Sequence, residues 1–256
     1  MSHHNKHLLY AFLHLPKTAG TTFCHHLRRH FWKHQLFPVY STSAEETHRT
    51  THDRILALTT WRRKRIRVAF GHNLYQGIEK PFGKDARYFT FMRDPIKRTF
   101  SHYNYNRTDL ESGPPFAHSP PVVSGDGRIL TFEEWFLKHR EMHAYITSVL
   151  CEFVTQSGSP VPATPSETLA TAKTALESFY FVGLTQNFEK DSAIMYQELG
   201  MRKPVSDQNV SHNYIEDDQK DRLTELVRSH TETEQELYRF AVELNHKFHK
   251  QRSMRE

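Results

Sequence analysis

The chain contains 256 residues, of which 37% are hydrophobic, so it is long enough to bury the core of one α/β domain. Its two cysteines exclude a disulfide framework, and its first apolar run, residues 8–15, is too short for a membrane span or a secretory signal. The 34 lysines and arginines outnumber the 29 acidic residues, which suits an anionic ligand, while no RNP, zinc-finger or helix-turn-helix pattern indicates a nucleic-acid-binding domain.

The first predicted elements are a strand over residues 8–15 and a helix over roughly 21–34, with an anion-binding loop between them. The first N–H groups of such a helix point into the loop, and Gly20 lets the backbone approach a ligand closely. Lys17 adds a full positive charge, and three threonines add hydroxyl donors. We predict that a phosphate or sulfate ester binds here, at Lys17, Thr18, Ala19, Gly20, Thr21 and Thr22.

The position of the lysine in this loop argues against nucleoside triphosphate chemistry. In the P-loop pattern G-x-x-x-x-G-K-[ST], the lysine follows the glycines at the start of the helix. Here Lys17 precedes Gly20, so ATP or GTP is a poor match. The alternative is an ordinary strand-loop-helix unit with a surface lysine.

A second functional position follows the next predicted strand. We expect a helix around residues 44–62 and then a short strand over 66–71, after which His72 comes directly. Catalytic side chains in open α/β sheets sit at the carboxyl ends of strands, and a histidine there can act as general base near neutral pH. His72 is the predicted base, with a structural histidine as the alternative. His14, directly before the anion loop, is the second candidate, although support of the loop suits it better.

Two further histidines and one basic run are expected to be exposed. His25 and His26 are adjacent on a helix and cannot easily share a metal, so we expect both to face solvent. The run WRRKRIR, residues 61–67, predicts a solvated helix end that leads into a strand. An edge that binds the acceptor is the alternative.

Residues 88–105 predict a second anion site at the junction of a strand and a helix. Arg93 ends the strand, Asp94 fits the N-cap and Pro95 fits the first position of a helix that runs to about residue 106. Ser101 lies two turns into this helix, so its hydroxyl and the Arg93 guanidinium could converge on one anion. A strand exit followed by a capped helix, without any ligand, is the alternative.

The rest of the chain predicts further helices and one more strand. Residues 111–128 are rich in Pro, Gly and Ser and predict a long loop, which is either a lid or an excursion without a role. We then expect a helix opened by a capping box at Thr131 and a helix over 140–155, followed by a break at 156–166. A helix from Ser166 to about 177 and a strand over 179–185 come next. The last predicted elements are a helix over 187–199, stopped by Gly200, and a long helix over 216–249. This alternation predicts an α/β fold in one domain, residues 1–256, with a mostly parallel central sheet flanked by helices.

The two predicted anion sites together resemble those of one enzyme family. Pro-Lys-Thr-Ala-Gly-Thr-Thr at residues 16–22 resembles the 5′-phosphosulfate loop of sulfotransferases that use PAPS (3′-phosphoadenosine 5′-phosphosulfate). The segment with Arg93, Arg98 and Ser101 resembles the 3′-phosphate site of the same enzymes. The resemblance implies a P-loop-like sulfotransferase fold and a PAPS-dependent enzyme.

Looser similarities point to the carbohydrate branch of that family. Gly71-His72 resembles the placement of the catalytic base in uronosyl 2-O-sulfotransferases such as the heparan sulfate enzyme. FVGLTQNFE at 181–189 is similar to a late strand and helix start of carbohydrate sulfotransferases, and NVSHN at 209–213 to a loop that can fold over the nucleotide. Residues 107–130, in contrast, match no family pattern.

The resemblance implies in-line transfer of a sulfuryl group from PAPS to a carbohydrate hydroxyl, with no metal. His72 would act as general base, while Lys17 and the loop N–H groups would stabilise the departing 5′-phosphate. Arg93 and Ser101 would bind the 3′-phosphate, and Arg98 would either assist or lie on the surface. The acceptor stays open among acidic polysaccharides, other glycans, glycolipids and small metabolites, and so does the oligomeric state. No nucleic-acid partner is expected.

Two other functions remain as alternatives, a P-loop-like kinase for a small molecule and a non-catalytic binder of nucleotide or acidic polymer. Animal carbohydrate sulfotransferases usually carry an N-terminal membrane anchor, whereas this chain begins almost at its first strand. We therefore expect a cytoplasmic protein without stable membrane insertion, and a bacterial source is compatible with that expectation.

Overall fold

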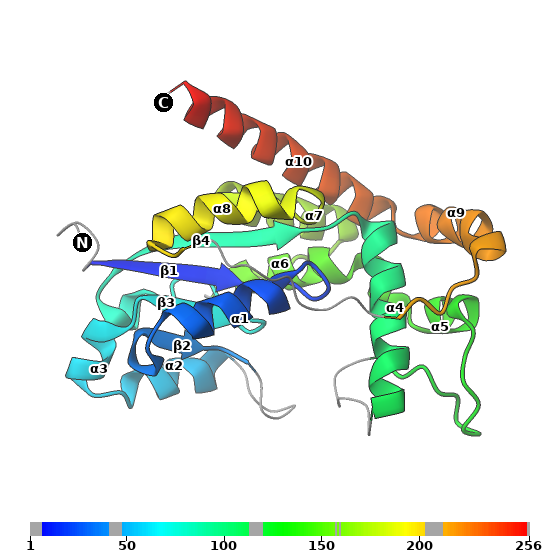
Figure 1. Cartoon of the computed structure of the whole chain (residues 1–256), viewed down its shortest axis with the longest axis horizontal. Helices are drawn as coiled ribbons and strands as arrows, with labels where there is room; N and C mark the ends of the chain where they lie inside the picture. The colour runs from blue at the N-terminus through cyan, green and yellow to red at the C-terminus, as the bar shows by residue number, and fades with distance from the viewer. Residues whose placement is uncertain are drawn as a thin grey trace.

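Five parallel strands form one central sheet in the order β2-β3-β1-β4-β5 (Figure 1). The computed structural model describes residues 7–40, 48–112, 120–156, 158, 160–202 and 212–254. The strands are β1 (Leu8–Leu13), β2 (Leu36–Pro38), β3 (Val68–Gly71), β4 (Asp85–Met92) and β5 (Phe181–Leu184). The predicted α/β fold with a mostly parallel sheet is therefore confirmed.

Helices connect and cover the strands (Figure 1). In chain order they are α1 (Gly20–His30), α2 (His48–Leu56), α3 (Thr60–Arg65), α4 (Pro95–Ser112), α5 (Phe132–Lys138), α6 (Tyr145–Thr155), α7 (Pro165–Glu177), α8 (Phe188–Leu199), α9 (Lys220–His230) and α10 (Glu232–Ser253). Short 3-10 turns are η2 (Lys33–Gln35), η3 (Lys80–Phe82), η4 (Arg140–Ala144), η5 (Thr185–Asn187) and η6 (Asp217–Gln219). Among these described elements, no helix is long and apolar enough to cross a membrane.

The central strand β1 is apolar on both faces, as expected for a strand of a parallel sheet that helices cover on both sides. Leu9 and Leu13 belong to a core that includes side chains from α6, α7 and α10, whereas Tyr10 and Phe12 belong to a core formed with α1 and α8. All four side chains are nearly inaccessible to solvent. The sheet is therefore fixed from both faces, and the ends of its strands are held in place.

The order of the strands creates a crevice at the carboxyl ends of β1 and β4. These strands are neighbours, but the chain leaves β1 toward β2 and β3 and leaves β4 toward β5 on the other side. Open α/β sheets bind ligands where neighbouring connections diverge in this way. Helix α4 stands beyond this edge and packs with α5 and α9 around a third apolar cluster (Figure 1).

Two helices that the sequence predicted as continuous are broken. The prediction over 44–62 is wrong as one helix, because α2 ends at Leu56 and α3 starts again after Thr59, whose hydroxyl accepts from the Arg62 N–H (3.2 Å); residues 44–47 lie outside the described part. The prediction over 216–249 is also wrong as one helix. Thr231 separates α9 from α10 and donates its hydroxyl to the Val227 carbonyl (2.8 Å). An amphipathic pattern continues across such a break, so periodicity alone did not reveal it.

The predicted helix signals were correct in two places and wrong in one. Thr131 forms the predicted capping box with Glu134, and Gly200 ends α8 in the left-handed region at φ 69°. The helix expected from Ser166 is capped instead by Thr164, which forms a capping box with Glu167 and places a proline in the first turn. The first residues of the helix predicted over 140–155 form a 3-10 turn, η4, before α6 begins. Of the loop 111–128, residues 113–119 lie outside the described part.

Candidate functional site

The loop between β1 and α1 has an unusual backbone. Lys17 and Ala19 adopt φ angles of 64° and 65°, and they are the only non-glycine residues in the described ranges with positive φ. This conformation costs an L-residue roughly 1–2 kcal/mol, so strong surrounding structure must hold it. Helix α1 starts with no capping side chain and no acidic residue in its first turn. No N-cap side chain and no acidic residue therefore competes with an anion at the start of α1.

Two residues of the loop serve its own packing. The Thr18 hydroxyl donates to the Leu15 carbonyl (2.8 Å) and the residue is buried, so this hydroxyl does not face the open side of the loop. Gly20 lies directly against the His14 ring, because a Cβ at residue 20 would come within 1.9 Å of His14 Cδ2. The glycine is thus required by a neighbouring side chain, whatever ligand approaches the loop.

We expect Gly20→Ala to destabilise the protein by about 1–3 kcal/mol, the usual cost of overpacking a tightly packed site. The added methyl group has to displace either the His14 ring or the start of α1. Denaturant unfolding measures the effect, and Gly125→Ala is the matched control, because a Cβ there meets no atom within 4 Å. Equal stabilities of the two variants would contradict the close packing of Gly20 on His14.

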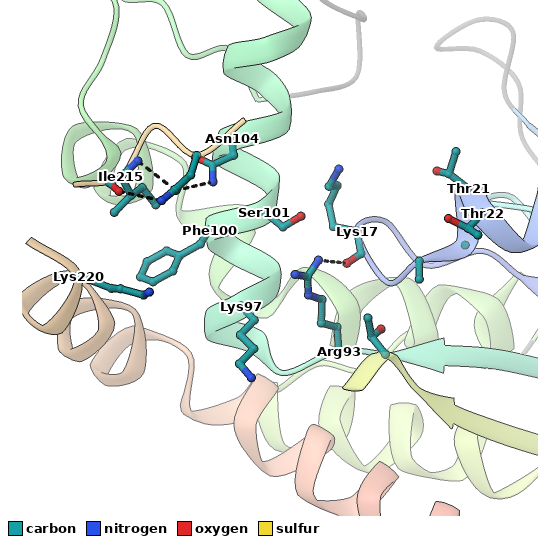
Figure 2. A pocket seen from close by; sticks show the side chains of 14 residues that line it. Lys17, Thr21, Thr22, Arg93, Lys97, Phe100, Ser101, Asn104, Ile215 and Lys220 are labelled. Atoms are coloured by element: carbon teal, nitrogen blue, oxygen red, sulfur yellow. Dashed lines mark hydrogen bonds between the residues drawn. The ribbon is translucent and has the colours of Figure 1, made fainter. Parts of the chain in front are cut away.

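A pocket of about 560 Å³ opens beside this loop, between the sheet and α4 (Figure 2). Four cationic side chains and no carboxylate line it, so its electrostatic potential favours an anion of several charges. The residues around it are Lys17, Ala19, Gly20, Thr21, Thr22, Arg93, Lys97, Phe100, Ser101, Asn104, Thr185, Asn213, Ile215 and Lys220. Seven of the eight predicted ligand-binding residues are in this set, and Thr18 is the exception.

Arg93 and Ser101 lie in the pocket because of the junction between β4 and α4. The Asp94 carboxylate accepts from the Lys97 N–H (2.9 Å), as expected of an N-cap, so α4 starts directly at the end of the strand. Arg93 Nη1 donates to the Lys17 carbonyl (3.1 Å), which links the two predicted anion sites. In Figure 2 the Ser101 hydroxyl points toward the same loop. The two sites therefore share one pocket.

Lys17 is a cation in an unfavourable environment. Burial, together with the nearby Arg93 guanidinium, lowers the pKa of Lys17 from 10.5 to about 8. Its Nζ lies 4.1 Å from the centroid of the Tyr105 ring, which stabilises the charged form in part. A bound anion would relieve the repulsion between Lys17 and Arg93, so the pocket gains electrostatically from anion binding.

Arg98 does not lie on the surface, so that one of its two alternatives is wrong. Its side chain is completely buried, donates from Nη2 to the Met142 carbonyl (3.2 Å) and is not among the residues around the pocket. Buried Glu234, whose carboxylate accepts from the Thr147 N–H (2.7 Å), offsets part of its charge. Arg98 thus belongs to the packing between α4 and α10 and would act on a ligand only indirectly.

His72 lies at the carboxyl end of β3, outside the set of residues that line the pocket. Its Nδ1 donates to the His14 carbonyl (2.5 Å), so in the neutral ring Nε2 keeps the free electron pair. Its ring lies 4.4 Å from the His14 ring and 5.1 Å from the Tyr40 ring. Desolvation by these neighbours lowers the pKa of His72, against a smaller opposite effect of the hydrogen bond to His14. The ring can therefore accept a proton at Nε2 at neutral pH.

His14 is a buried connector between the loop and β2. Its Nδ1 shares a hydrogen bond with the Tyr40 hydroxyl (2.9 Å), which also lies 3.1 Å from Cys24 Sγ. Burial first, and then the positive charges of His72, Arg28 and Lys17, hold the pKa of His14 well below its ordinary value. Burial raises the pKa of the Cys24 thiol to about 11. The arrangement gives His14 the geometry of loop support.

His26 is buried, so the expectation that it faces solvent is wrong. It is only 5% exposed, and its Nδ1 shares a hydrogen bond of 2.7 Å with the Tyr196 hydroxyl, which joins α1 to α8. In the described ranges no group of three or more His, Cys, Asp or Glu side chains could hold a metal ion.

The sequence reasoning missed half of the pocket. Lys97, Phe100 and Asn104 line the pocket beside Ser101 on α4, and the spacing of Lys97 and Asn104, four residues before and three residues after Ser101, could have revealed these two. Asn213 is held by Asn104, whose amide donates to its side-chain oxygen (3.1 Å). The other contributors are Thr185, Ile215 and Lys220. Thr185 and Asn213 lie in the two segments, 181–189 and 209–213, that family similarity singled out without a role for either residue; residues 209–211 lie outside the described part. Ile215 and Lys220 come from a segment that no local pattern marks.

The sequence matches the family model described as "Sulfotransferase family" over residues 3–250. No curated protein matches it in sequence. Among solved structures it is similar to mouse sulfotransferase SULT7A1 complexed with PAP, with 13% identity, a TM-score of 0.31, and coverage of 92% of this chain and 90% of that chain.

Proposed function

The chain belongs to the sulfotransferase family, and from that premise we propose that it transfers a sulfuryl group from PAPS to a hydroxyl group of a carbohydrate. One observation carries the proposal. The strand-loop-helix with Lys17 and the second anion site with Arg93 and Ser101 share a single pocket that no carboxylate lines. A ligand with two separated phosphate groups suits this arrangement better than a ligand with one. A single domain over residues 1–256 would carry the whole site.

The residues of the pocket fit the two ends of PAPS. Lys17 and the N–H groups of Gly20, Thr21 and Thr22 would hold the 5′-phosphosulfate, together with the backbone of Thr18 and Ala19. Arg93 and Ser101 would hold the 3′-phosphate. When bound, PAPS supplies a sulfuryl group attached to a phosphate leaving group. Lys17 would neutralise the charge that develops on that phosphate as the bond to sulfur breaks.

His72 is the proposed general base. Its Nδ1–H is fixed on the His14 carbonyl, so Nε2 is free to take the proton of the acceptor hydroxyl as the oxygen–sulfur bond forms. The strand end that carries His72 adjoins β1, whose next segment is the anion loop. In-line transfer would then bring the acceptor from the β3 side. No metal is required for this step, because Lys17 and the helix start supply the positive charge.

Transfer itself can be tested with radiolabelled PAPS and a panel of acceptors that includes an acidic polysaccharide, a neutral glycan, a glycolipid and a small alcohol. We expect the label to appear in a carbohydrate, without added magnesium. Magnesium-dependent transfer from labelled ATP would instead support the small-molecule kinase. Binding of PAP without transfer to any acceptor would support a non-catalytic nucleotide-binding protein.

Arg93→Ala should weaken binding of PAP (adenosine 3′,5′-bisphosphate) by about 10–100-fold, because a hydrogen bond to a charged group contributes roughly 1.5–3 kcal/mol. Affinity for adenosine 5′-monophosphate should stay nearly unchanged, since that ligand lacks the 3′-phosphate. Isothermal titration calorimetry measures both affinities. Arg128→Ala is the control, because Arg128 is exposed and pairs with Glu134 away from the pocket. Equal losses for both ligands would refute the assignment of Arg93 to the 3′-phosphate.

A further inference from the structure

The positive charge of the chain is concentrated in its first third. Residues 1–78 contain 12 lysines and arginines but only three acidic residues, whereas residues 79–256 contain 22 and 26. The stretch 54–78 contains no aspartate or glutamate at all. The proposed transfer pocket uses only Lys17 of these 12 cations. The rest of the positive charge in residues 1–78 needs a separate explanation.

Much of this charge gathers at the amino end of the sheet, on the short helix α3 and the turn η2. Both elements directly precede a strand, so they lie at the edge opposite the pocket (Figure 1). We call the side chains at this edge the basic patch. Its members are Trp32, Lys33, Trp61, Arg62, Arg63, Lys64, Arg65 and Arg67.

The basic patch is one connected surface. Arg62 Nη2 donates to the Lys33 carbonyl (2.5 Å), which ties α3 to η2. The Arg65 guanidinium lies 4.4 Å from the centroid of the Trp61 ring. Trp32 and Trp61 are 74% and 57% exposed, although large apolar side chains are usually covered. None of the patch cations forms an ion pair with a carboxylate of the described residues.

Like charges crowd each other in this region. Burial lowers the pKa of Lys84, next to the patch, and the positive charge of Arg67 lowers it further. The pKa of His30 is also lowered, again first by burial and then by the charge of Arg67. A solvated surface with balanced charges would not show this repulsion. A polyanion would remove it, and the exposed Trp32 ring offers a flat face to the C–H face of a sugar ring.

We propose that the basic patch is a docking surface for an anionic polysaccharide, which it holds at the edge of the sheet opposite the transfer pocket. The proposal rests on the proposed function for its choice of polymer. Nucleic acid fits less well, because an Arg65 guanidinium covers Trp61 and leaves no open row of aromatic faces for successive bases. An anionic membrane fits less well because α3 has only six residues and presents no apolar face to insert.

The length of the sheet sets a minimum length for the polymer. In the sheet Val68 pairs with Tyr10 and Gly71 with Leu13, so the four residues of β3, about 13 Å at the rise of a strand, separate the amino edge beside the patch from the carboxyl edge beside the pocket. A short oligosaccharide in the pocket cannot reach the patch, whereas a long chain can contact both. The patch should therefore raise the affinity for long anionic acceptors and leave the chemical step untouched.

Binding to heparin, a sulfated uronic-acid polysaccharide, tests the proposal without any transfer. We expect Lys64→Gln/Arg65→Gln to bind long heparin about tenfold more weakly at fixed salt, and Trp32→Ala to bind it more weakly as well. Lys247→Gln/Lys250→Gln is the matched control, because it removes two exposed charges from one face of another helix, α10. Circular dichroism and thermal unfolding show that each variant is folded.

The outcomes separate this inference from the proposed function. Equal losses of heparin affinity in the patch variant and in the α10 control would overturn the docking surface, because heparin binding would then depend on net charge alone. Patch-dependent binding that is tighter for single-stranded DNA of equal charge, or for phosphatidylserine vesicles, would also overturn it. Patch-dependent heparin binding in a protein that transfers no sulfuryl group would refute the proposed function and keep the docking surface. With an active enzyme, the patch variant should raise KM for long chains only and leave kcat unchanged.

Discussion

Lys17→Ala is expected to lower kcat by about 10²–10³-fold, the usual effect of removing one group that stabilises charge in the transition state. Lys17 sits between the start of α1 and Arg93, where charge on a departing phosphate would develop. The protein should remain folded, because Lys17 is only partly buried and makes no ion pair with a described carboxylate. Single-turnover rates with labelled PAPS measure the effect on the transfer step.

The pH dependence gives a second readout of Lys17. Its pKa is lowered to about 8, so the residue loses its charge as the pH rises through that value, and kcat/KM should fall above it. Lys17→Arg keeps a positive charge at every accessible pH and should move this alkaline limb upward. If the Lys17→Ala and Lys17→Arg variants had the same dependence of kcat/KM on pH as the wild type, Lys17 would not have the proposed role.

His72→Ala is expected to lower kcat by about 10²–10⁴-fold, the range for loss of a general base. Only the neutral ring can accept a proton, and desolvation holds the pKa of His72 below 6.5. The acid limb of kcat/KM in the wild type should therefore lie below pH 6.5, and it should be absent from the variant. Binding of PAP should be unaffected, because His72 does not line the pocket.

His14→Gln is the control for the base assignment. The His72 hydrogen bond uses the backbone carbonyl of residue 14, which the substitution keeps, while the imidazole itself is removed. We expect this variant to be less stable toward unfolding and to retain the acid limb of the kcat/KM profile. If His72→Ala kept full transfer activity, or if only the His14 variant lost the acid limb, the general base would have to be sought elsewhere.

Local signals were sufficient for most of the fold. The alternating strands and helices predicted the parallel sheet, because the four predicted strands contain short apolar runs and their connections are long enough for a crossover. The edge strand β2, Leu36–Pro38, was not predicted, because three residues are too short to show a pattern. The breaks at residues 57–59 and at Thr231 were missed, since amphipathic character continues through both. The cap at Thr164 was missed because Ser166 offered a similar signal two residues later, and the proline at the first helical position should have decided between them.

The site was predictable where one short segment builds it and unpredictable where distant segments meet. The loop at Lys17 and the junction at Arg93 are local, and the structure brings them into one pocket. Lys220, at the start of α9, comes from more than 100 residues further along the chain, and the packing of α9 against α4 brings it there, whereas a hydrogen bond from Asn104 holds Asn213. The buried position of Arg98 was equally hidden, because a charged residue on a helix is exposed in most proteins.

The two buried cysteine thiols can report local opening of the structure. Cys24 is 1% exposed on α1, next to His14 and Tyr40, and Cys151 is 6% exposed on α6, across the sheet. Since a protonated, buried thiol reacts poorly with alkylating reagents, each should be modified mainly when its surroundings open. The ratio of the two labelling rates would then report how much more often the loop side of the core opens than the α6 side, without any introduced dye or substitution.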